Sequence, residues 1–119
     1  MTDSNEIKLA VREFCAAAIE KGDFASPASH DRKLHAAMSR AVQKLHSLGA
    51  SGAEALRALL QHESPHVRSW VAAELLAAGD KTAKPVLEAL ASNPGLLGTS
   101  ANTVLREYEK GRLRSPFGA

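Results

Sequence analysis

Three features common in other protein classes are missing from this sequence. Cys15 is the only cysteine among 119 residues, so no disulfide can form within the chain, which fits a reducing compartment. No stretch approaches the roughly 18 consecutive apolar residues of a membrane-spanning helix. The first residues place acids before their apolar run and lack a basic segment followed by a long apolar one, so no secretory signal is expected. These absences predict a cytoplasmic protein.

The length and composition indicate the size of the core, and the charge distribution bears on nucleic-acid binding. With 45% apolar residues over 119 positions, the chain is long enough to form one core, and a single domain over residues 1–119 is expected. The net charge of +2 is distributed unevenly, since residues 30–50 are basic and residues 51–80 are net acidic. A dedicated nucleic-acid surface would gather cations on one face, so this mixture argues against one.

Apolar residues recur at three- and four-residue spacing along nearly the whole chain, which indicates amphipathic helices. No segment shows the period-two alternation of a strand. The sequence therefore predicts an all-α fold with helices over residues 4–21, 34–48, 51–60, 65–78, about 82–92 and 97–108, followed by a tail at 110–119. The apolar stripe of the first helix is predicted to contain Ile7, Val11, Phe14, Cys15, Ala18 and Ile19, with Cys15 a small buried hydrophobe.

Two helix starts have recognisable signals. Ser64 precedes Pro65, and a serine hydroxyl can cap free N–H groups while proline at the first helical position has no N–H to leave unpaired. Ser51 and Glu54 have the spacing of a capping box. We therefore expect one helix to begin at Pro65 and another at Ser51.

The sequence contains an internal repeat. A shift of thirty residues superposes apolar positions on apolar positions, as in Ala53 on Ala83, Leu56 on Val86, Leu60 on Leu90, Val67 on Leu97, Leu75 on Leu105, Ala41 on Val71 and Leu45 on Leu75, and places Gly49 on Gly79. A fixed period of this size, with two short helices in each unit, is typical of an α-solenoid. We predict a short right-handed solenoid of about three helix pairs, the first pair elaborated by a loop at residues 22–29.

The segment "SPHVRSWVAAELL" resembles the second helix of a HEAT-type repeat. Over about residues 5–111 the chain resembles a family of small bacterial proteins, a domain of unknown function with a HEAT-like fold. The matching pieces are Leu45-x-x-Leu48-Gly49, Leu59-Leu60-x-His62, Pro65-x-Val67-Arg68-x-Trp70-x-Ala72-Ala73, Val86-Leu87 and Leu105-Arg106-Glu107-Tyr108-x-x-Gly111. The resemblance implies a HEAT-like α-α superhelix that acts as a scaffold, with no catalytic residues to carry over.

The letters "HESPH" match the zinc-protease motif H-E-x-x-H, in which one helix presents both histidines to the metal. Pro65 interrupts that helix, so His62 and His66 are expected on different elements. No cysteine pair adds ligands, and no nucleophile elbow, phosphate-binding glycine loop or paired carboxylates are recognisable. We predict no metal site, no cofactor and no enzymatic activity.

Three other residues of this segment have structural interpretations. Arg68 follows a valine, as in HEAT-type helices where such an arginine bonds to neighbouring turns. Trp70 lies at the edge of the apolar stripe and is predicted to close the core with its indole N–H at the surface. Glu74 falls inside that stripe, thirty residues after Lys44, which predicts an ion pair between the two.

The leading functional hypothesis is a protein-binding module. The second helices of helical solenoids line a surface available to a partner. Projection at 100° per residue places a polar set, and Ala73 with it, opposite the apolar stripes. The candidate binding residues are Arg32, Ser39, Gln43, His66, Ser69, Thr103 and Arg106. Their alternative interpretation is an ordinary solvated face. The resemblance implies a protein partner, most concretely a bacterial toxin neutralised by an immunity protein. Nucleic-acid binding is the alternative, because HEAT-like arrays also occur in DNA-repair glycosylases.

Overall fold

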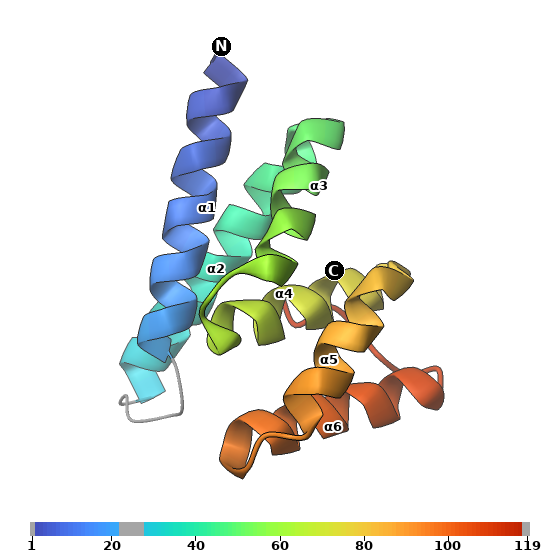
Figure 1. The fold of residues 1–119 in the computed structure, drawn as a ribbon. Helices are drawn as coiled ribbons and strands as arrows, with labels where there is room; N and C mark the ends of the chain where they lie inside the picture. The colour runs from blue at the N-terminus through green and yellow to red at the C-terminus, as the bar shows by residue number, and fades with distance from the viewer. Residues whose placement is uncertain (1, 22–27, 118–119) are drawn as a thin grey trace. The chain divides into compact units, whose positions relative to one another are not determined.

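The computed structural model describes residues 2–21 and 28–117, and every regular element within these ranges is helical (Figure 1). The predicted all-α class is confirmed. The α-helices are α1 (Thr2–Lys21), α2 (Ala28–Ser47), α3 (Gly49–Ala58), α4 (Pro65–Ala77), α5 (Lys84–Ala91) and α6 (Gly95–Glu109), with short 3₁₀ helices η1 (Leu59–Gln61) and η2 (Lys81–Ala83). Residues 22–27 of the predicted loop lie outside the described residues, and the prediction for residues 28 and 29 is wrong, because α2 already begins at Ala28.

The packing divides the chain into two compact units, residues 1–59 and 60–119, and each is described by itself. Within each unit, helices that are neighbours in the chain pack on one another, as expected of an α-α superhelix. The single-domain prediction for residues 1–119 concerns both units together and stays a prediction.

In the first unit, α1 and α2 lie side by side and run antiparallel, and α3 contacts both (Figure 1). Phe14, Met38, Leu45 and Leu56 are fully buried in its core. The predicted stripe of α1 is partly wrong, because Ile19 is 50% exposed. The buried face runs instead through Ala10, Phe14, Ala17, Ala18 and Lys21, which recur at helical spacing. Lys21 pairs with Asp31 of α2 at 2.5 Å.

The start of α3 differs from the prediction. The helix begins at Gly49, the N-cap residue Leu48 makes no side-chain capping bond, and Ser51 lies exposed inside the helix. Gly49 has φ +71°, a conformation that glycine adopts without a steric penalty, and this lets α3 follow α2 almost directly. The turn is tight: a Cβ at Gly52 would lie 1.8 Å from the Leu45 carbonyl oxygen. The capping box is therefore not needed and does not form.

In the second unit, α4 packs against α5, α6 and η2, and α5 packs against α6. The predicted start of α4 is confirmed, since the Val67 amide donates to the Ser64 hydroxyl at 3.4 Å and Pro65 opens the helix. After α4, the Gly79 amide donates to the Leu76 carbonyl at 3.0 Å. Around its middle the helix is buried on every side, at Val71, Ala72, Ala73, Glu74, Leu75 and Leu76.

Candidate functional site

The turn before α4 is held by Arg68. Its Nη1 donates to the carbonyl oxygens of His62 at 2.6 Å and Glu63 at 3.0 Å. The Ser64 amide donates to Nδ1 of His62 at 2.9 Å, which closes the same turn from the other side. The predicted bonding of Arg68 to a neighbouring turn is confirmed, and its guanidinium supplies donors to two carbonyls of that turn.

The same turn separates the two histidines of "HESPH". His62 lies between η1 and α4, whereas His66 lies in the first turn of α4, so they do not share a helix face. The prediction that Pro65 breaks the zinc-protease geometry is confirmed. Among residues 2–21 and 28–117, no group of three or more His, Cys, Asp or Glu side chains is placed to hold a metal ion.

An open hollow of about 470 Å³ lies beside Arg68 within the second unit. Leu60, Pro85, Val86, Ala89 and Leu90 form its apolar part, and Gln61, Arg68 and Asn93 its polar part. These polar side chains supply hydrogen-bond donors and neutral amide oxygens. None of the lining residues has a carboxylate, thiol or imidazole that could act as a general base. The hollow therefore offers apolar surface together with hydrogen-bonding groups.

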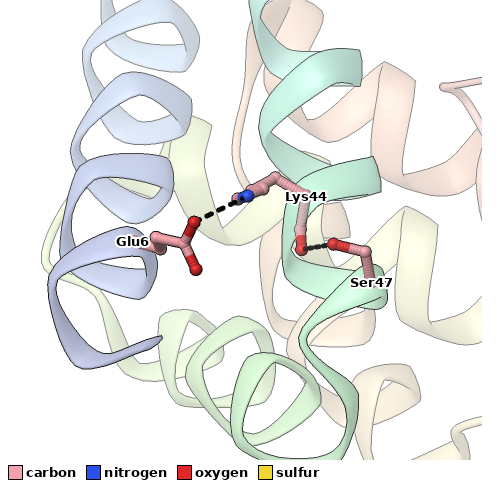
Figure 2. A network of polar contacts seen from close by, with 3 residues as sticks. All are labelled: Glu6, Lys44 and Ser47. Carbon is pink, nitrogen blue, oxygen red and sulfur yellow. Dashed lines mark hydrogen bonds and ion pairs between the residues drawn. The ribbon is translucent and has the colours of Figure 1, made fainter. Parts of the chain in front are cut away.

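The candidate binding residues of α2 lie in the first unit. Arg32 and Gln43 are exposed, while Ser39 is half-buried and accepts a hydrogen bond from the Gln43 amide at 3.3 Å. Lys44, on the same helix, does not form the predicted ion pair with Glu74. Its Nζ contacts Oε1 of Glu6 on α1 at 3.0 Å, and its carbonyl accepts from the Ser47 hydroxyl (Figure 2).

The remaining candidates lie in the second unit. Thr103 and Arg106 of α6 are exposed, and the Thr103 hydroxyl donates to the Thr99 carbonyl at 3.0 Å. His66 and Ser69 of α4 are half-buried. The expected exposure of Ala73 is wrong, since this residue is only 6% exposed. The projection failed because it assumed one apolar stripe, whereas the middle of α4 is covered all round.

A contact missed by the sequence analysis lies on this helix. Gly111, with φ +71°, ends α6, and the following segment returns to α4 (Figure 1). The Ser115 hydroxyl donates to the Glu74 carboxylate, and the Phe117 ring lies 5.7 Å from the Trp70 ring, tilted by 40°. The only feature of the sequence that could have indicated this packing was the aromatic Phe117 within an otherwise mainly polar tail.

The tail supplies a hydrogen bond to Glu74 and a ring contact to Trp70. Glu74 is 5% exposed, so its carboxylate needs polar partners, and Ser115 supplies one. Trp70 is half-buried, as expected at the edge of the apolar stripe, and its ring packs against the ring of Phe117. The tail predicted at 110–119 therefore packs against α4 through Ser115 and Phe117.

Cys15 is half-buried rather than buried on α1. Burial raises the pKa of the Cys15 thiol above its ordinary range, because removing solvent disfavours the thiolate. A raised pKa lowers the nucleophilicity available near neutral pH.

Comparison with known proteins adds a family to this geometry. The HEAT repeats family matches residues 28–105, a span that includes the Ser64 cap and Arg68. No curated protein and no solved structure matched the chain. Among the described residues, no helix combines the length and apolarity required to cross a membrane. HEAT repeats commonly mediate protein–protein binding, and no enzyme family was found. The chain belongs to the HEAT repeats family.

Proposed function

We propose that the chain is a non-enzymatic module that binds another protein through polar residues of its second helices. The proposed contacts are Arg32, Ser39, Gln43, His66, Ser69, Thr103 and Arg106. Family membership supports the function, and the exposure of the two arginines supports the choice of surface. The single cysteine fits a cytoplasmic location.

The observation that carries the proposal is the state of Arg32 and Arg106. Both side chains are exposed, and neither makes a hydrogen bond or ion pair with the described residues. Exposed cations of this kind contribute little to folding but steer and orient association with a partner of opposite charge. The proposed partner therefore presents carboxylates to these positions.

The test combines capture with charge reversal. The immobilised chain is used to capture partners from cells that make it, and mass spectrometry identifies them. The doubly substituted Arg32→Glu, Arg106→Glu chain should lose affinity for the captured protein while its melting temperature stays nearly unchanged. The control reverses the exposed charges Lys8→Glu and Arg12→Glu on α1, which gives the same change in net charge on a helix that carries none of the proposed contacts. Equal affinity of both double variants would refute the assignment of the surface.

The finer proposal is that the partner is a toxin and the chain an immunity protein. Its support is membership of a helical repeat family that commonly mediates protein–protein binding. Expression of the captured protein alone should arrest growth, and co-expression of the chain should restore it. A captured protein without toxicity would leave the binding module intact but refute this partner class.

A further inference from the structure

The contact between the tail and α4 uses two side chains on each side. Trp70 and Glu74 lie one turn apart on α4, with a rise of about 6 Å between them. Ser115 and Phe117 lie two residues apart, and two residues of chain span at most about 7 Å. The spacing of the tail therefore matches the spacing of the helix positions, which allows both contacts to form together.

The tail is also shaped for this contact by its own sequence. The Ser115 hydroxyl donates to Glu74 and accepts from the Phe117 amide at 3.1 Å, so one oxygen fixes both the anchor and the turn. Pro116 lies between the two anchors and restricts the backbone to a narrow range of φ. A pre-organised segment loses less conformational entropy on docking than a flexible one.

We propose that the face of α4 formed by Trp70 and Glu74 is a peptide-docking site, and that the tail is its resident occupant within the same chain. The site accepts a hydroxyl-bearing residue followed by proline and an aromatic residue. The occupant to which we commit is a partner segment of this chemistry with a basic residue before the hydroxyl, as Arg114 precedes Ser115 in the tail. This inference deepens the proposed function, on which it rests: the partner binds by displacing the tail.

Trp70 is the only tryptophan in the sequence and reports directly on this face. The experiment uses the full chain with Ser115→Ala and Phe117→Ala, which releases the tail, and a synthetic peptide with the sequence of residues 112–119. The variant's emission should shift to longer wavelength, and the peptide should reverse that shift saturably. A peptide carrying Phe117→Ala should have no effect.

The unsubstituted chain should respond to the peptide only at concentrations at least about tenfold higher, because its own tail competes at an effective concentration in the millimolar range. Absence of any peptide response in a variant that keeps its helical circular dichroism would refute the site. If that variant does not fold, a photoreactive peptide is added to the unsubstituted chain. Cross-linking to residues 65–77 then supports the site, and absence of cross-linking refutes it.

These outcomes are separable from the proposed function. Loss of the peptide response together with retained, Arg32- and Arg106-dependent partner binding would refute the docking site alone. A saturable peptide response without a partner that depends on the two arginines would refute the proposed surface and keep the docking site.

Discussion

Arg68 donates from Nη1 to the carbonyl oxygen of His62 at 2.6 Å, reaching back six residues to the turn that precedes its own helix. The guanidinium also holds the Glu63 carbonyl, so one side chain satisfies two backbone acceptors of the turn. Backbone carbonyls that lose their partners must be resolvated, and this costs free energy when they are only partly accessible.

Arg68→Met should therefore lower the free energy of unfolding by about 1–2 kcal/mol, because methionine keeps the aliphatic stem and removes the donors. The matched control is Arg40→Met on α2, an exposed arginine without a hydrogen bond or ion pair to the described residues, which should change stability by less than about 0.5 kcal/mol. Urea unfolding curves measure both. Equal effects of the two changes would contradict the assigned role of Arg68.

Ser64→Ala should cost about 1 kcal/mol, because it removes the acceptor for the Val67 amide at the start of α4. Ser51→Ala provides the contrast. Ser51 lies exposed within α3 and caps nothing, and alanine is the better helix former, so this change should be neutral or stabilising by up to about 0.5 kcal/mol. Thermal unfolding measures the stability of both variants. A larger loss of stability for Ser51→Ala than for Ser64→Ala would favour the capping box instead.

Gly98→Ala should destabilise the second unit by about 1–3 kcal/mol. A Cβ at this position would lie 1.8 Å from the Asn93 carbonyl oxygen, a backbone atom that cannot move away without shifting the start of α6. Ser100→Ala, on the exposed side of the same helix, is the control and should be nearly neutral. A melting temperature unchanged by Gly98→Ala would show that the turn before α6 is looser than described.

Cys15 should react slowly with iodoacetamide in the folded protein and faster in urea at the same pH. Burial raises the pKa of its thiol, so the folded state holds the proton more tightly than the unfolded state. The resulting stability is present below the ordinary thiol pKa and is lost as pH rises through the raised value. Mass spectrometry of labelling between pH 7 and 10 measures the rates, and equal rates in both states would contradict burial as the cause.

Nucleic-acid binding predicts a different behaviour. A chain that neutralises phosphates loses affinity steeply as salt rises. We expect no binding to duplex or single-stranded DNA tighter than the nonspecific range of about 10⁻⁴–10⁻⁶ M at physiological salt. Fluorescence anisotropy with both DNA forms decides, and sub-micromolar, salt-sensitive binding would overturn the protein-partner proposal.

The elements that could be predicted are those set by local chemistry. The helix over 65–77 follows from Ser64 and Pro65, whereas the role of Arg68 is implied by the resemblance to HEAT-type helices. Gly49 and Gly79 both take a positive φ directly after residues 48 and 78, where the helices are predicted to end. These features depend on neighbours within a few residues, so the sequence contains the information needed.

The elements that could not be predicted depend on distant segments. Ala73 is buried because α4 is covered on all sides, and no periodicity within one helix reveals that. Ser51 does not cap α3, because the tight turn at Gly49 and Gly52 starts the helix before it. That turn depends on how α3 meets the end of α2. The Ser115–Glu74 contact joins residues 41 apart, beyond any local pattern. The seven candidate binding residues stay a prediction.

The separation of Glu74 from Ser115 in the sequence also determines how long after α4 its tail contact is synthesised. Ser115 is translated 41 residues after Glu74, so at roughly 5–20 residues per second the helix waits about 2–8 s for its hydroxyl donor. During that interval Trp70 lacks Phe117 as well. A partner segment present at the ribosome would therefore meet α4 before the tail does, so the order of arrival as well as affinity would determine which segment occupies the helix.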